Sequence, residues 1–185
     1  MIQTDHQYDD ASGQCRGLFA QKMKDYGSAW RILRLSSIVD QIYIKAWRIR
    51  NLETLAEQKV DDDIPTEFIG ILNYSLMGLI QCELGPAEDI DMDPKKVLEL
   101  YDRHLASCKK LMQMKNHDYG EAWRHMSQSS LTDLILMKIL RMRSITEQGG
   151  ATLVSEGIDA NLQDIVNYAA FALIKVAEGS EKELA

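Results

Sequence analysis

The sequence predicts an all-α protein: an internally duplicated helical bundle in which two helical repeats pack around a pseudo-twofold axis. Two observations carry this prediction. A ten-residue phrase occurs twice, as KMKDYGSAWR from Lys22 to Arg31 and as KNHDYGEAWR from Lys115 to Arg124. Helix caps and helix-type apolar patterns also recur along the chain, without the strand alternation and hairpin signals of a sheet. Two fused copies of one unit are expected to pack as the subunits of a homodimer do.

The duplication extends well beyond the repeated phrase. At a shift of 93 residues, 18 of the 43 positions from Tyr8 to Arg50 are identical to those from Tyr101 to Arg143, where roughly two would match by chance. With one further residue of shift, Ile64 to Ile80 aligns with Ile158 to Ile174. The chain therefore divides into a first repeat, a linker rich in Pro, Gly and acids, and a second repeat, packed together as one globular unit: residues 1–84, 85–94 and 95–185.

The first helix of each repeat is expected to end at a glycine. In the second repeat Asp93 supplies an N-cap and Pro94 the first helical position, and the helix is predicted to run to about Lys115. Gly120 then falls where a left-handed C-terminal cap is expected, and Gly27 is its counterpart in the first repeat.

The central helix of each repeat is expected to start at a serine pair. Ser37 with Asp40, and Ser130 with Asp133, have the spacing of a capping box. The stretch LTDLILMKILRMRSI in the second repeat is apolar on nearly every side, which predicts a buried helix.

The last helix is expected from Glu156 to about Glu178, with Ser155 as its cap. Its counterpart in the first repeat is entered through Pro65, which follows three aspartates.

The composition excludes several functional classes. A net charge of -7, from 28 acidic and 21 basic residues, argues against broad binding to nucleic acid or to a membrane surface. No apolar stretch approaches the ~20 residues of a membrane span, and the first thirty residues lack a signal-peptide core, so a cytoplasmic protein is expected. Three cysteines without C-x-x-C spacing indicate neither a disulfide framework nor a zinc site.

Three polar residues of the central helix are the same in both repeats, although the apolar residues around them change. They are Asp40/Asp133, Lys45/Lys138 and Arg48/Arg141. At 100 degrees per residue the three fall within about 140 degrees, so they form one polar edge. Because a lone buried charge costs several kcal/mol, this edge is expected to meet partners, and it is a candidate half of a site.

The last helix adds carboxylates on one face. Glu156 and Asp164 lie on the side away from the apolar stripe, with Asp159 near them. Several carboxylates brought together from two helices suit Mg²⁺, which prefers oxygen ligands and retains water and phosphate oxygens. Lys and Arg nearby would meet the remaining phosphate charge, and a metal-activated water could attack a phosphoanhydride.

Structural explanations of the same residues stay open. Asp40 and Asp133 also fit capping boxes, and the acidic face of the last helix also fits a solvated surface. Lys138 and Arg141 could pair with Asp133 or extend their charges to solvent. The aromatic pairs Tyr26/Tyr119 and Trp30/Trp123 fit either core anchors or platforms for base stacking.

Three segments of the second repeat carry a resemblance to a known family. KNHDYGEAW, SLTDLILMKILRMRSI and SEGIDANLQDIVNYA resemble the nucleotide modification associated domain 1 family. The similarity covers both repeats, and the combination D-Y-G, D-x-x-x-x-K-x-x-R and D-x-x-N-Y is specific. That family looks related to MazG-like and dimeric dUTPase-type all-α nucleoside triphosphate pyrophosphatases, which bind Mg²⁺ through clustered Glu and Asp and are dimeric or pseudo-dimeric.

The resemblance implies a metal site and a nucleotide site. The implied metal ligands are Asp133, Glu156 and Asp164, with Asp159 in an outer position. The implied nucleotide contacts in the second repeat are Lys115, Asp118, Tyr119, Trp123, Arg124, Lys138, Arg141 and Asn167. Those in the first repeat are Lys22, Asp25, Asp40, Lys45, Arg48 and Asn73.

The chain departs from the MazG pattern in both repeats. The first central helix has no E-x-x-E pair, and the expected E-x-x-D reads Asn161 to Asp164. The first repeat has Gly70 opposite Asp164, Asp62 opposite Glu156, and Glu67 opposite Asn161. The first repeat is therefore either a degenerate site or a contributor of polar residues to one composite site.

Two functions follow as hypotheses. The leading one is a Mg²⁺-dependent nucleotide pyrophosphohydrolase that acts on a nucleoside triphosphate and releases pyrophosphate. The alternative is a non-catalytic nucleotide-binding or assembly module whose metal site has degenerated. The sequence leaves open whether the chain forms a homo-oligomer.

Overall fold

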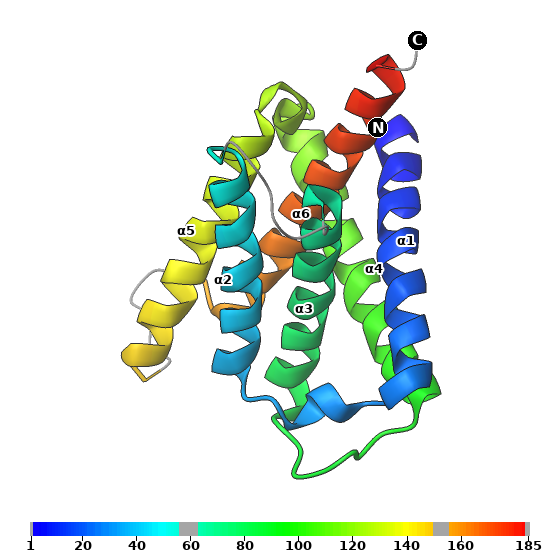
Figure 1. Ribbon diagram of the computed structural model, residues 1–185, viewed down its shortest axis with the longest axis vertical. Coiled ribbons are helices and arrows are strands. Elements are labelled where there is room, and N and C mark those ends of the chain that lie inside the picture. Colours follow the sequence, from blue (N-terminus) through cyan, green and yellow to red (C-terminus); the bar gives the residue numbers. More distant parts are fainter. Residues whose placement is uncertain (1, 56–62, 150–155, 184–185) are drawn as a thin grey trace.

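The computed structural model describes residues 2–55, 63–149 and 156–183. All regular structure in this part of the chain is helical, which confirms the predicted fold class (Figure 1). The first repeat holds α1, η1, α2 and α3: Ile2–Tyr26, Ala29–Ile32, Leu35–Leu52 and Ile64–Leu84. The second holds α4, η2, α5 and α6: Pro94–Tyr119, Ala122–His125, Gln128–Glu147 and Ile158–Glu183.

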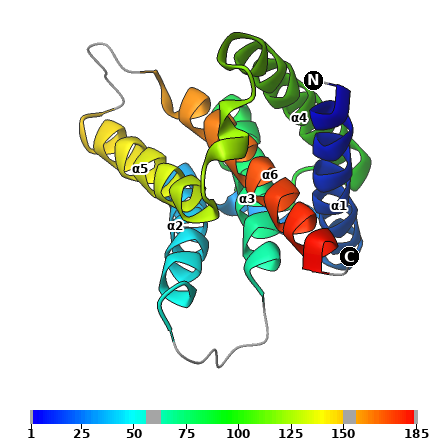
Figure 2. The same ribbon diagram turned by 90° about the horizontal axis from the view of Figure 1, so that it is seen from above.

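The helices form three layers that are related in pairs by the pseudo-twofold axis. Helices α3 and α6 lie side by side in the middle and share the largest contact in the molecule. Helices α2 and α5 pack on one side of this pair, and α1 and α4 lie on the other (Figures 1 and 2). Since α1 contacts α6 as well as α3, and α4 contacts α3 as well as α6, each repeat packs into the other.

The glycine caps predicted for the first helix of each repeat are confirmed, although α4 ends at Tyr119 and not at about Lys115. Gly27 and Gly120 have φ angles of 58° and 60°, the left-handed region in which a residue without Cβ is favoured. Their backbone N–H groups donate to Met23 O at 3.0 Å and to Asn116 O at 3.0 Å. The 3₁₀ turns that follow turn the chain toward α2 and α5.

The starts of α3 and α4 are capped by aspartate. The Asp63 side chain accepts a hydrogen bond from Thr66 N at 2.9 Å, and Asp93 accepts one from Lys95 N at 2.8 Å. A proline follows each cap within two residues. The hydrogen bonds from Thr66 lower the pKa of the Asp63 carboxyl, because they favour its charged form.

The predicted starts of the central helices are wrong by about one turn. Helix α5 begins at Gln128, where the Ser127 side chain accepts a hydrogen bond from Ser130 N at 3.1 Å. Helix α2 begins at Leu35, and Arg34 at its N-cap makes no side-chain cap. Asp40 and Asp133 therefore lie inside their helices and belong to no capping box.

Helix α6 begins at Ile158, two residues after the predicted start. Its predicted cap, Ser155, and the aspartate opposite Glu156, Asp62, both lie outside the described residues.

A pair of buried hydrogen-bond networks joins the repeats with pseudo-twofold symmetry. Tyr8 of α1 donates to Asn167 Oδ1 of α6 at 2.9 Å, and Tyr101 of α4 donates to Asn73 Oδ1 of α3 at 2.8 Å. Each asparagine donates in turn to a cysteine carbonyl of its own repeat, Asn73 to Cys15 O and Asn167 to Cys108 O, both at 3.1 Å. The two tyrosine hydroxyls are thus satisfied only when both repeats are in place.

No helix in the described part of the chain is long and apolar enough to span a membrane.

Candidate functional site

The two aspartates of the predicted polar edge bind arginines of the opposite repeat. Arg143 Nη2 lies 2.7 Å from Asp40 Oδ1, and Arg50 Nη1 lies 3.7 Å from Asp133 Oδ1. These exposed pairs link α2 to α5 on the outer surface. Asp133 and Lys138, expected on one polar edge, therefore have partners on different helices. The angle of a residue around its own helix does not show which neighbouring helix its side chain faces.

Asp164 is the central acid of the second repeat. Its carboxylate accepts hydrogen bonds from Lys115 Nζ at 2.5 Å and from Lys138 Nζ at 2.6 Å. Asp164 and Lys138 are 5% and 6% exposed, so the pair is buried. Partial burial alone would lower the pKa of Lys115, but the hydrogen bond and charge of Asp164 outweigh it and raise that pKa.

The other two predicted metal ligands do not join Asp164. Glu156 is exposed before the start of α6. Asp159 is exposed and lines a shallow hollow with Cys82 and His104. Within the described ranges no three His, Cys, Asp or Glu side chains come together in a way that could hold a metal ion. Both oxygens of Asp164 already accept from ammonium groups, so these residues do not fit the predicted Mg²⁺ site as they stand.

The first repeat has its own buried acid, one turn earlier on the equivalent helix. Glu67 of α3 is 3% exposed. It accepts a hydrogen bond from Lys45 Nζ at 3.1 Å and another from Arg48. One turn later, at the position of Asp164, stands Gly70. A Cβ added to Gly70 would lie 2.6 Å from Lys45 Cε, so the missing side chain is what lets Lys45 lie against α3.

The two repeats therefore pair the same three cations differently. In the first repeat Glu67 holds Lys45 and Arg48, and in the second Asp164 holds the counterparts of Lys45 and Lys22. This leaves Lys22 without an ion pair or hydrogen bond to any residue that the structure describes. In the second repeat the remaining cation of the three is Arg141, the counterpart of Arg48. Burial raises the pKa of the Tyr168 phenol, and the charge of Arg141 opposes that rise.

A pocket of about 190 Å³ opens in the first repeat between α1, α2 and α3. Two lysines line it, and none of the lining residues is acidic. The other lining groups are aromatic, apolar or neutral and polar, and they include Phe19, Tyr26, Trp30, Thr66, Asn73 and Tyr74. The combination of ammonium groups with aromatic walls suits an anion that carries a planar ring.

Trp30 forms a mostly buried part of the pocket wall. Its side chain lines the pocket and is only 8% exposed. The indole Nε1 atoms of Trp30 and of its counterpart Trp123 are both buried and have no hydrogen-bond partner in the described part of the chain.

Most other predicted nucleotide contacts are occupied by protein groups. Arg124 donates to Glu121, Glu178, Thr4 and Gln7, and its guanidinium lies 4.5 Å from the ring centre of Trp123. Its counterpart Arg31 pairs with Asp91 at 3.1 Å and donates to Gly85 O at 2.7 Å, which attaches the linker. The asparagines hold the tyrosine networks.

The remaining predicted contacts lie on the surface. Tyr119 is 72% exposed, and Asp118 pairs only with the neighbouring His117 among the described residues. Asp25 is exposed near the end of α1. In the repeated phrase the tryptophan and the arginine therefore stabilise the structure. The lysine lies in the helix before the turn, and in the second repeat it pairs with Asp164.

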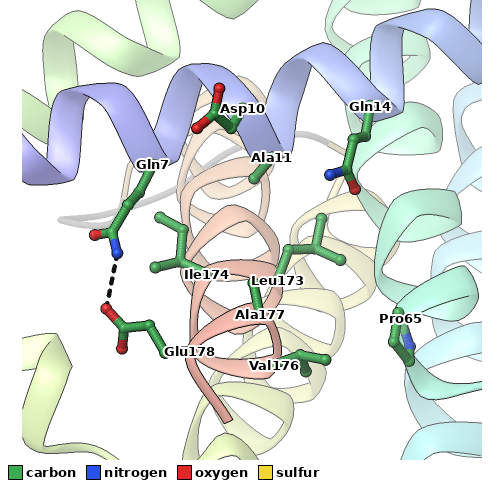
Figure 3. Close-up of a pocket in the computed structure, with 10 residues that line it drawn as sticks. All are labelled: Gln7, Asp10, Ala11, Gln14, Pro65, Leu173, Ile174, Val176, Ala177 and Glu178. Carbon is green, nitrogen blue, oxygen red and sulfur yellow. Dashed lines mark hydrogen bonds between the residues drawn. The ribbon is translucent and has the colours of Figure 1, made fainter. Parts of the chain in front are cut away.

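A second pocket, of about 290 Å³, lies between α1 and α6 (Figure 3). Gln7 and Gln14 reach from α1 toward α6, and Gln7 Nε2 donates to Glu178 Oε1 at 2.8 Å. The floor is formed by Leu173 and Ile174. Asp10 and Glu178 are its charged groups, so this pocket is less suited to an anion than the first-repeat pocket.

Fold and site together define an internally duplicated all-α protein in which each repeat sets two basic side chains against one buried carboxylate. The family model described as nucleotide modification associated domain 1 matches residues 22–82 and 115–176. The chain belongs to this family and carries two copies of its domain, as the resemblance of the motifs predicts. No match to the chain was found among curated proteins or among solved structures.

Proposed function

We propose that this protein is a nucleotide-binding module that holds its ligand in the first-repeat pocket between α1, α2 and α3. The observation that carries the proposal is the pairing of Lys22 and Lys45 with aromatic walls in a pocket without a lining carboxylate. The family description connects the domain with nucleotides, which are anions that carry planar rings.

The residues suggest how a nucleotide would be held. Lys22 is the cation free to take a phosphate, and Lys45 can share its second and third donors beyond Glu67. Tyr26, Trp30 and Tyr74 offer ring faces to a base.

The arrangement favours binding over metal-dependent pyrophosphohydrolysis. Glu67 and Asp164, the two buried acids of α3 and α6, are each held by two cations. A metal would have to displace an ammonium or guanidinium group before it could bind either acid.

Isothermal titration calorimetry with nucleoside mono-, di- and triphosphates, with and without Mg²⁺, tests the proposal. We expect at least one nucleotide to bind in metal-free buffer and to change the tryptophan fluorescence of the protein. Lys22→Ala should weaken binding by about tenfold or more, because a charge-assisted hydrogen bond is lost. Lys24→Ala, which removes an exposed lysine from the same helix, is the matched control and should bind as the unaltered protein does.

Two results would overturn the proposal. One is that no nucleotide binds, and the other is that Lys22→Ala binds as tightly as Lys24→Ala. Pyrophosphate release measured in parallel would show whether binding is accompanied by turnover, and Mg²⁺-dependent release by the unaltered protein would favour the pyrophosphohydrolase instead.

A further inference from the structure

Aligning the repeats shows which residues open the pocket. The lining residues Lys22, Trp30 and Lys45 are identical in the second repeat, as Lys115, Trp123 and Lys138. Six of the ten other lining positions differ between the repeats, and two of these differences place a larger group beside the shared lysines and tryptophan. Gly70 is replaced by Asp164, and Met77 is replaced by Phe171.

In the second repeat both replacements occupy the site. The Asp164 carboxylate lies between Lys115 and Lys138, the counterparts of the two pocket lysines. The Phe171 ring lies flat on Trp123, with ring centres 4.2 Å apart and planes 3° from parallel. Phe171 is 7% exposed, so the stacked pair is buried.

In the first repeat neither position carries an acid or a ring, and a pocket of about 190 Å³ lies beside both. Gly70 has no side chain, and the Lys45 stem passes over it to reach Glu67. Trp30 is contacted by Phe19 at a tilt of 58° with ring centres 6.4 Å apart, so this neighbour does not cover the indole as a parallel ring would. The flexible Met77 lines the pocket where the second repeat has a rigid ring.

We infer that the second repeat is a closed copy of the ligand site, in which Asp164 and Phe171 stand where the ligand's anion and ring lie in the first repeat. Gly70 and Met77 are then the residues that decide which repeat binds, and the chain takes one ligand. This inference rests on the proposed function and narrows its ligand class. One carboxylate satisfies both lysines and one ring covers the tryptophan, so the matching ligand is a nucleoside monophosphate.

Reciprocal exchange of the differing residues tests this inference. The first variant, Glu67→Asn/Gly70→Asp/Met77→Phe, gives the first repeat the residues of the second. The introduced aspartate can then pair with Lys22 and Lys45, as Asp164 pairs with their counterparts. In Asn161→Glu/Asp164→Gly/Phe171→Met the second repeat receives the opening residues, and the introduced glutamate becomes the partner of buried Lys138. Calorimetry with a nucleoside monophosphate should give one site in the unaltered protein, none in the first variant and two in the second.

The outcomes separate the inference from the proposed function. If the unaltered protein binds no nucleotide, the proposed function fails. If it binds one, but the first variant binds equally well or the second variant still has one site, the open and closed assignment fails. Circular dichroism melting of both variants establishes that each is folded before its stoichiometry is used.

A measurement without ligand keeps the inference testable even if no nucleotide binds. Lysine reactivity toward reductive methylation, followed by peptide mass spectrometry, reports which amines are held by a carboxylate. Lys22 should react at least several times faster than Lys115 in the unaltered protein. The first variant should slow Lys22 and the second should speed Lys115, while Lys24 stays constant in all three. Equal rates for Lys22 and Lys115 throughout would overturn the inference.

Discussion

At the scale of single residues, the buried ion pairs explain why lysine and arginine recur on otherwise apolar helices. Lys138 has an 8% exposed side chain and finds its counter-charge on the neighbouring helix α6, not on its own helix. The pattern along one helix therefore indicates the cations but not their partner. Glu67 and Asp164 are different residue types at positions that do not align, so the alignment of the repeats does not indicate that both are buried counter-charges for basic side chains.

Asp164→Ala should destabilise the protein by about 3 kcal/mol or more, because Lys138 would stay buried without a counter-charge. Urea unfolding followed by circular dichroism measures the loss. Asp133→Ala is the matched control: its 61% exposed side chain makes only a distant surface pair, so we expect a change of less than about 1 kcal/mol. Equal effects of the two substitutions would contradict the structural role of Asp164.

At the scale of helices and turns, the ends of helices were predicted best where the backbone conformation requires a particular residue type. Gly120 and Gly27 end their helices because their φ angles disfavour a side chain, and proline with aspartate marks the starts of α3 and α4. The central helices were harder to delimit. Several serines follow one another before α5, and only the three-dimensional position of Ser127 shows which of them caps the helix.

Two glycine substitutions separate backbone conformation from side-chain space. A Cβ added to Gly120 or to Gly13 would meet no atom within 4 Å, but only Gly120 has a positive φ. Gly120→Ala should therefore cost about 1–2 kcal/mol, whereas Gly13→Ala, inside α1, should stabilise by about 0.5–1 kcal/mol. Thermal melts of the two variants beside the unaltered protein check both signs. Destabilisation by Gly13→Ala would show that α1 needs its glycine for another reason.

At the scale of the whole molecule, the duplication predicted the pseudo-twofold bundle because matching sequences fold into matching units. The repeat alone could not show that each unit is completed by the other. Tyr8 and Tyr101 reach across the boundary to Asn167 and Asn73. Nor could it show that Gly70, which looks like the loss of an acid, accompanies an open pocket.

A single repeat is expected not to fold as a monomer. Residues 93–185 alone would leave Tyr101 without Asn73 and expose the face of α6 that packs on α3. Size-exclusion chromatography and circular dichroism should therefore find this fragment associated or largely unfolded, and mixing it with residues 1–92 should restore helical content and a cooperative melt. A monomeric fragment with a cooperative melt of its own would contradict the shared core.

The glycine at position 70 also shows what joining two copies in one chain permits. In a homodimer of identical subunits every substitution occurs twice, so removing an acid from one site would remove its copy from the other. In the joined chain, position 70 is a glycine while position 164 is a buried acid. The two halves can therefore differ at equivalent positions, which two identical subunits cannot do.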